Sequence, residues 1–319
     1  MGTEDVTREL TTRTENAPRE LLTRSFFLFC AILSIVTTLS IVVLLVTEAS
    51  KFFELTAWLS GVQGETASLA EFLTGTRWQI NTGNFGVIPL VSATLQITIG
   101  SAVVALPLGV ATAIYLSEYA SRRTRSVLKP ALEILAGIPT VVYGFFALIY
   151  ITPALETVIP SLGFFNMLSA SIVVGIMIVP MVASISEDAM DAVPDELRQA
   201  GYGMGATKFD VSTGIVFPAA LSGILSSFIL ALSRAIGETM AVTIAAGSQA
   251  NLHNPLNPLD YLEGAMPMTA AMVNLLTGDI TGGGLAYRSL FAIGLTLFVI
   301  TLAMNVISNV VTERYREGY

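Results

Sequence analysis

The sequence predicts an all-α, polytopic membrane protein, and two observations carry that prediction. Hydrophobic residues make up 53% of the 319 residues and charged residues only 13%, which is more apolar than a soluble domain. A membrane-spanning helix needs about 20 consecutive apolar residues, and six stretches of this chain qualify. They cover residues 25–47, 89–117, 127–155, 168–186, 219–247 and 285–311.

These spans divide the chain into five parts. We expect an N-terminal tail over 1–24, a first span over 25–48, an external interfacial segment over 49–85, a core of five spans over 86–312, and a C-terminal tail over 313–319. The first span follows Arg19 and Arg24, but it is too long for a cleaved secretory signal and lacks a small-residue cleavage site. A retained signal anchor is therefore expected.

Basic residues predict the orientation in the membrane. Of the 16 Lys and Arg residues, 12 lie in the two tails and in alternate connecting segments, three lie in the remaining segments, and Arg234 lies within a span. Because cytoplasmic segments carry the excess of Lys and Arg, both termini are expected in the cytoplasm. The net charge is −8, and residues 187–218 carry six carboxylates against two bases. An acidic cytoplasmic face favours a basic partner, although adaptation to high salt produces the same bias.

Two further segments are predicted to lie at the outer interface. Large apolar side chains recur along the polar segment 49–85. They are Phe52, Phe53, Leu55, Trp58 and Leu59, followed by Phe72, Leu73 and Trp78. Aromatic rings prefer the membrane interface, so this spacing favours short interfacial helices. Residues 266–276 are interpreted in the same way.

The composition argues against an enzyme. One histidine, His253, and one cysteine, Cys30, lie far apart and cannot build a zinc site or a nucleophile pair. Gly201, Gly203 and Gly205 do not follow the G-x-G-x-x-G spacing, and the chain has no G-x-x-x-x-G-K-[ST] motif. We expect no metal, no cofactor and no nucleic-acid partner.

The long cytoplasmic loop, residues 187–218, predicts an interaction element. Pro194 suits the first turn of a helix, and Asp195 and Glu196 then lie at its positive end. Small residues follow, and Gly205 among them suits a turn. A short helix that turns sharply and lies against another protein is expected.

Arg234 and Glu238 are the candidate functional pair within the membrane. They stand four residues apart on one face of the helix predicted over 219–247, and Arg234 lies about 22 Å from the start of that helix. A lone charge there costs at least about 2.5–3.5 kcal/mol, and Arg before Glu is the weaker order for a helical pair. A functional role is therefore favoured over a bridge that holds the bundle together.

Smaller polar features predict kinks and one further pair. Pro139 and Pro180 each remove a backbone hydrogen bond inside a span, which allows bending as a gate or serves packing alone. Glu133 is expected to pair with Lys129, one helical turn earlier.

Several motifs resemble a known family. The cytoplasmic loop resembles the EAA loop of ABC-importer permeases. The matching residues are Gln199, Ala200 and Gly201, then Gly205, then residues 215–218 (IVFP). GIPTVVYGFF from Gly137 and SRAIGETMAV from Ser233 narrow the resemblance to phosphate permeases of the PstC type. The loop departs from the family pattern in having Gln199 for the usual glutamate, Gly201 for the second alanine and Phe217 for leucine.

The resemblance implies a type I ABC-importer permease fold whose loop forms a coupling helix on an ATPase subunit. The coupling residues would then be Pro194, Glu196, Arg198, Gln199, Ala200, Gly201, Gly205, Ala206, Thr207 and Lys208. Arg234 would contact phosphate oxygens, since an arginine fork suits a tetrahedral oxyanion. Glu238 would neutralise the guanidinium between turnovers.

The implied function is that of a cell-membrane permease subunit of an ATP-driven importer of inorganic phosphate. Its expected partners are a sister permease of the A type, two ATP-binding subunits that hold the ATP, and an extracytoplasmic phosphate-binding protein. Two alternatives stay open. One is an ABC permease for sulfate or molybdate, and the other is a proton-coupled carrier.

Overall fold

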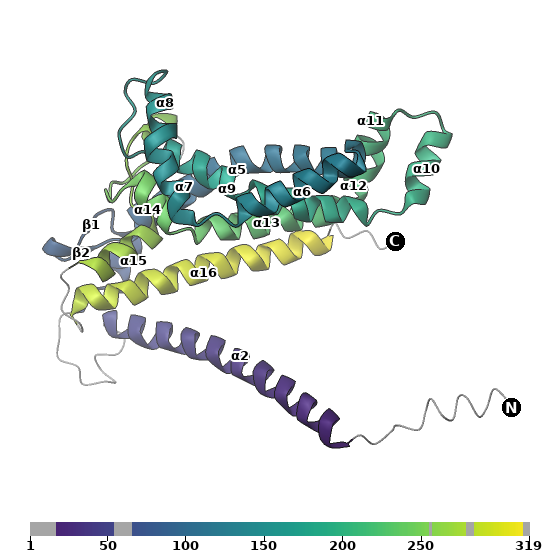
Figure 1. Cartoon of the computed structure of the whole chain (residues 1–319). Helices are drawn as coiled ribbons and strands as arrows, with labels where there is room; N and C mark the ends of the chain where they lie inside the picture. The colour runs from purple at the N-terminus through teal and green to yellow at the C-terminus, as the bar shows by residue number, and fades with distance from the viewer. Residues whose placement is uncertain (1–16, 54–65, 255–256, 279–283, 315–319) are drawn as a thin grey trace. The chain divides into compact units, whose positions relative to one another are not determined.

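Helices dominate the computed structural model, which describes residues 17–53, 66–254, 257–278 and 284–314 (Figure 1). The chain divides into two units, residues 1–48 and 49–319. The longer helices are α2 (Ala17–Phe52), α5 (Ile88–Ile114), α6 (Arg122–Ala136), α9 (Met167–Asp191), α13 (Leu221–Ile236) and α16 (Leu285–Arg314). The shorter helices are α4 (Leu69–Thr74), α7 (Thr140–Phe146), α8 (Thr152–Glu156), α10 (Asp195–Gly203), α11 (Lys208–Val211), α12 (Phe217–Ala219), α14 (Met240–Ala246) and α15 (Met268–Thr277).

Short 3-10 and π-helical segments connect several of these helices. The π-helical segments are Tyr115–Tyr119, Ala147–Ile151 and Ser212–Val216, and the 3-10 turns are Ile80–Thr82 and Pro258–Leu262.

Four described helices are long and apolar enough to cross a membrane. These segments are Leu21–Phe52, Ile88–Tyr119, Met167–Asp191 and Leu285–Val310. Two bent helix pairs also meet the same criterion. Arg122–Gly137 and Thr140–Glu156 meet at 89°, and Lys208–Ala219 and Leu221–Ile236 meet at 69°. The described chain thus has up to six spans if each bent pair crosses once, which is consistent with the predicted number.

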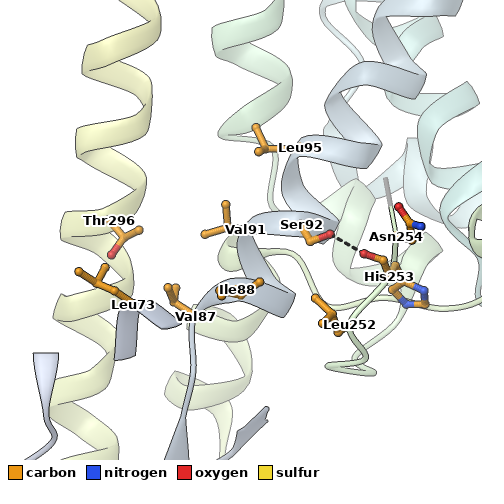
Figure 2. Close-up of a pocket in the computed structure, with 10 residues that line it drawn as sticks. All are labelled: Leu73, Val87, Ile88, Val91, Ser92, Leu95, Leu252, His253, Asn254 and Thr296. Atoms are coloured by element: carbon orange, nitrogen blue, oxygen red, sulfur yellow. Dashed lines mark hydrogen bonds between the residues drawn. The ribbon is translucent and has the colours of Figure 1, made fainter. Parts of the chain in front are cut away.

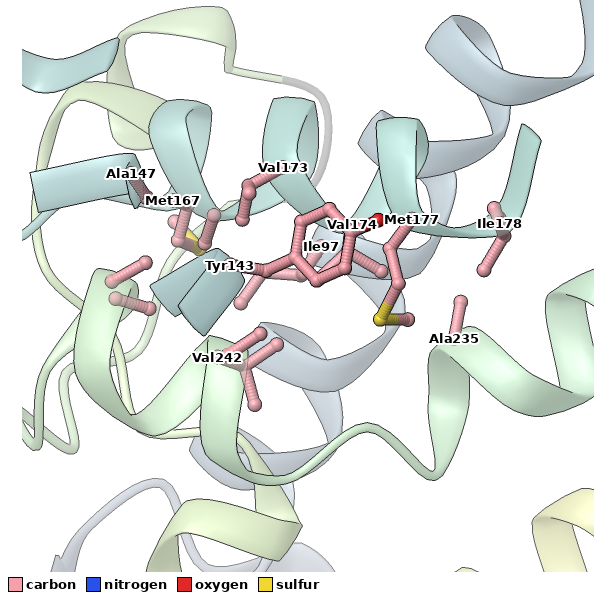
Figure 3. Packing of buried hydrophobic residues seen from close by; sticks show 14 of the residues in the cluster. Ile97, Tyr143, Ala147, Met167, Val173, Val174, Met177, Ile178, Ala235 and Val242 are labelled. Atoms are coloured by element: carbon pink, nitrogen blue, oxygen red, sulfur yellow. The ribbon is translucent and has the colours of Figure 1, made fainter. Parts of the chain in front are cut away.

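The helices α5 and α9 pack against each other at the centre of the second unit. Glycines allow the close approach: a Cβ atom at Gly109 would lie 2.6 Å from Val182, and one at Gly175 would lie 2.8 Å from Val104. Small residues serve helix packing in this way when both helices face an apolar medium. Figure 3 shows Tyr143 of α7 within the core, among side chains of α9 and near Val242 of α14.

Two of the predicted spans are interrupted. Gly137, Ile138 and Pro139 separate α6 from α7, so Pro139 precedes a new helix and does not merely kink a continuous one. The residue before a proline disfavours helical geometry, and proline lacks the N–H that would continue the helix. By contrast, α9 runs without a break through Pro180.

The prediction of one helix over 219–247 was wrong. The helix α13 ends at Ile236, and Gly237 is its C-cap. A second helix, α14, begins at Met240 after Glu238 and Thr239.

The prediction of short helices in the segment 49–85 is confirmed in part by α4, but Trp78 lies outside a helix and most of the described aromatic side chains are buried. Trp78 pairs with Phe85 in a two-stranded hairpin of β1 (Trp78–Gln79) and β2 (Asn84–Phe85). Phe52, Phe72, Trp78 and Phe85 are buried, and their rings meet edge to face, for example at 5.4 Å between Phe52 and Phe85. Edge-to-face contacts are a favourable arrangement of aromatic rings, so these side chains stabilise one another in a core.

The short helix predicted over 266–276 is present as α15, although several of its side chains are buried. Within α15, Met268, Ala271 and Leu275 are buried in the same apolar cluster as the hairpin aromatics. The predicted positions Leu55, Trp58 and Leu59 lie outside the described residues.

Candidate functional site

Arg234 and Glu238 lie on opposite sides of the break between α13 and α14. Arg234 is in the last turn of α13, where the partial negative charge of the helix end favours a cation. Its side chain is exposed, and among the described residues it forms no ion pair. The expected ion pair with Glu238 is therefore absent from this structure, because the helix that would align the two side chains ends between them.

Glu238 is buried and holds the break together. Its side-chain oxygen Oε1 accepts a hydrogen bond of 3.2 Å from the backbone N–H of Ala241, in the first turn of α14. Its backbone carbonyl accepts a 2.7 Å hydrogen bond from the Thr269 hydroxyl of α15. The carboxylate thus caps the start of α14, a favourable place for negative charge.

Arg234 belongs to a cavity of about 500 Å³ between α6, α9 and α13. Lys129 and Glu133 of α6 line it, as do Glu187 and Asp188 of α9. Pro180 also lines the cavity. Charged side chains from three helices therefore surround one water-accessible space, which is the environment that an ionic substrate requires.

A cluster of charges, here called the α6–α9 clamp, lies partly in the wall of this cavity. Its members are Arg125 and Lys129 of α6 and Glu187, Asp188 and Asp191 of α9. Glu187 is fully buried, with Arg125 Nη2 at 2.5 Å from one carboxylate oxygen and Lys129 Nζ at 3.0 Å from the other. Arg125 also pairs with Asp191. The two cations compensate a carboxylate that would be costly to bury alone.

The predicted pair of Lys129 with Glu133 was wrong, because Lys129 turns to Glu187 and approaches Asp188 at 3.7 Å. No residue of α6 is buried among the described residues. Ion pairs therefore help to hold α6 against α9, together with the partly buried Leu135, which packs on the apolar core.

A larger cavity of about 670 Å³ lies at the opposite end of the core, near α4 and the start of α5 (Figure 2). Apolar side chains such as Val87, Val91 and Leu95 dominate its lining. The Ser92 hydroxyl in its wall donates to the His253 carbonyl at 3.0 Å. Because no Lys or Arg lines this cavity, it does not suit an anion, despite its greater size.

The predicted interaction helix is present as α10, and Arg198 fastens it to the core. The guanidinium donates to the carbonyls of Val193 and Met190 at 2.5 and 2.7 Å, and to Glu118 at 3.2 Å. The Arg198 side chain is only 15% exposed, and that of Glu118 only 5%. Arg198 thus caps the C-terminal end of α9 and ties it to α10. Carbonyl groups at the end of a helix favour a cation in this position.

A sharp turn follows α10. Gly205 has φ +83°, a conformation that favours glycine. The Thr207 hydroxyl and the Asp210 carboxylate then form a reciprocal capping box at the start of α11. Gly201 is buried. The segment packs closely there, since a Cβ atom at Gly201 would lie 2.6 Å from Ile215.

The remaining predicted coupling residues lie on the outside of this segment. Pro194, Glu196, Gln199, Ala200, Thr207 and Lys208 are exposed, and Ala206 is partly buried. Tyr202, Met204 and Phe209, which the sequence interpretation did not single out, are also exposed, Met204 to 86%. Large apolar residues within a polar loop were the available signal for such a surface.

Comparison with known proteins decides the family. The family described as "Binding-protein-dependent transport system inner membrane component" matches residues 105–317. The chain belongs to this family. A phosphate transport system permease protein PstC of Mesorhizobium japonicum is 33% identical over 262 residues, covering 76% of this chain and 78% of the relative. A Bacillus subtilis protein named as probable ABC transporter permease protein YqgH is 32% identical over 296 residues, covering 92% and 91%.

A solved structure supports the fold of this inner membrane component. The bacterial alginate ABC transporter bound to its periplasmic protein includes a chain with TM-score 0.65 and 14% identity, covering 96% of this chain and 99% of that chain. As a transport-system membrane component, the chain is a permease subunit and not an enzyme. The residues that match the family contain Arg234, the clamp and α10.

Proposed function

We propose that this permease forms half of the translocation path of an ATP-driven importer of inorganic phosphate. The cavity with its unpaired Arg234 carries the proposal, since a guanidinium fork suits the oxygens of a tetrahedral anion. The PstC relative, 33% identical, supports phosphate as that anion. Glu238 lies across a short break from Arg234, and we assign it the role of counter-ion between turnovers, when it leaves its cap on α14.

The proposed orientation places both termini and α10 in the cytoplasm, in accord with the distribution of Lys and Arg. A sister permease of the A type would complete the path. One of two ATP-binding subunits would contact α10, and an extracytoplasmic phosphate-binding protein would deliver the substrate at the opposite face. The exposed Tyr202, Met204 and Phe209 offer the ATP-binding subunit an apolar contact.

Movement of α10 would then open the path alternately to each side. Arg198 fixes α10 to the end of α9, so a shift of α10 is transmitted to the wall of the cavity. Pro139 at the break and Pro180 within α9 are the proposed points of bending.

Transport by the reconstituted complex tests the function. In proteoliposomes with the binding protein outside and ATP inside, we expect uptake of radioactive phosphate that stops without ATP. Uptake should withstand collapse of the proton gradient and excess sulfate or molybdate. Inhibition by sulfate or molybdate would instead indicate another oxyanion, and uptake that depends on the proton gradient would indicate a carrier.

Replacement of Gly205 tests the coupling segment. We expect Gly205→Val to lower phosphate import per ATP hydrolysed by roughly tenfold, because a side chain in this left-handed conformation costs about 1–2 kcal/mol and shifts the turn. Gly214→Val is the matched control, because Gly214 lies outside α10. A Cβ at Gly214 meets nothing within 4 Å, and Gly214 lacks the left-handed φ. Equal import per ATP in both variants would contradict the coupling role of this turn.

A further inference from the structure

The cavity that contains Arg234 holds a second cation on a different helix. Lys129 of α6 and Arg234 of α13 both line it. We propose that Lys129 joins Arg234 in contacting the transported oxyanion, so that the anion is held between α6 and α13. This inference rests on the proposed function and adds a residue to its substrate site.

The two cations of the clamp differ in a way that selects Lys129. Both contact Glu187, but Arg125 does not line the cavity and has a second carboxylate partner in Asp191. The second partner of Lys129 is Asp188, which is 3.7 Å away and 68% exposed. If Lys129 turns to an anion, Glu187 therefore keeps Arg125. A lysine ammonium on its flexible stem suits such an exchange of partners.

The acidic side chains of the cavity do not oppose this role. Glu187 is compensated by Arg125, while Glu133 and Asp188 are exposed and their charges are screened by solvent. An anion must compete with Glu187 for Lys129, which weakens binding and favours release.

A cysteine introduced in the cavity wall tests whether the anion occupies the cavity. Ser184 lines the cavity and is exposed, and Cys30 is the single cysteine of the chain. In the assembled complex carrying Cys30→Ser and Ser184→Cys, a negatively charged thiosulfonate reagent modifies the introduced thiol. We expect inorganic phosphate to slow this modification. With Lys129→Gln added, half-protection should require about tenfold more phosphate, as for loss of one charged hydrogen bond.

Arg122→Gln is the matched control, since it removes an exposed cation of α6 that does not line the cavity and leaves both partners of Glu187 in place. It should leave the phosphate concentration for half-protection unchanged, and Lys129→Arg should restore most of the protection. Arg125→Gln weakens the clamp without altering the cavity lining, so it should shift that concentration less than Lys129→Gln does. All variants are compared at equal amounts of assembled complex.

Two outcomes would overturn the inference, and they differ in what else they affect. If Lys129→Gln and Arg125→Gln shift protection equally, Lys129 acts only in the clamp. If protection is lost with Arg234→Ala but unchanged with Lys129→Gln, the proposed function stands and Lys129 is not a ligand. Absence of protection when both Lys129 and Arg234 are retained would contradict the phosphate site itself.

Discussion

Replacing Arg234 with alanine is expected to abolish phosphate import by an otherwise assembled complex. Two charge-assisted hydrogen bonds from a guanidinium fork are worth about 3 kcal/mol or more, which corresponds to a loss of about 100-fold or more in transport rate. Stability should change little, because the exposed side chain has no ion-pair partner among the described residues and its favourable position at the helix end contributes about 0.3–1 kcal/mol. The measurement is ATP-dependent phosphate uptake at matched membrane abundance.

Three variants sharpen this experiment. Arg234→Lys keeps the charge but loses the fork, so partial import is expected. Glu238→Gln keeps an oxygen that can cap α14 and removes the counter-ion charge, which separates those two roles. Arg122→Ala removes an exposed arginine of α6 outside the cavity and should transport normally. Unchanged phosphate accumulation in both Arg234→Ala and Glu238→Ala would defeat the proposed site.

Apolar composition predicted the segments of the membrane core but not the changes of axis within them. The break at Gly137 contains a proline, which marked the position but left open whether the helix bends or stops. The break at Gly237 contains no proline, and Gly237, Glu238 and Thr239 lie between two apolar stretches that one helix could have included. Only the neighbouring helix reveals the reason for it, since Thr269 of α15 bonds the Glu238 carbonyl freed there.

The same limit applies to the charged residues. Spacing of one helical turn favoured the pair Lys129 with Glu133, which is the contact that a sequence can reveal. The packing of α6 on α9 instead offers Glu187, a buried carboxylate that needs compensation more than an exposed one. Likewise, Phe72 and Trp78 pack in a core formed with residues distant in the sequence, so their burial did not follow from local spacing.

Replacing Arg198 with leucine is expected to uncouple ATP hydrolysis from import. The substitution removes the donors to the Val193 and Met190 carbonyls and leaves the nearly buried Glu118 without its cation. Breaking such a buried pair costs about 3–5 kcal/mol. The segment α10 would then move without α9. ATP hydrolysis should continue while phosphate import falls, and both rates can be measured in the same proteoliposomes.

The control distinguishes transmission within this chain from contact with the ATP-binding subunit. Asp195 is the fourth partner of Arg198, but it is 83% exposed, so its ion pair is worth at most about 1 kcal/mol and Asp195→Asn should leave coupling intact. If Arg198→Leu lowers ATP hydrolysis and import in parallel, the residue instead serves docking of the ATP-binding subunit. Normal rates of both ATP hydrolysis and import would contradict the proposed link between α10 and α9, because no intact anchor would then be needed to move the cavity wall.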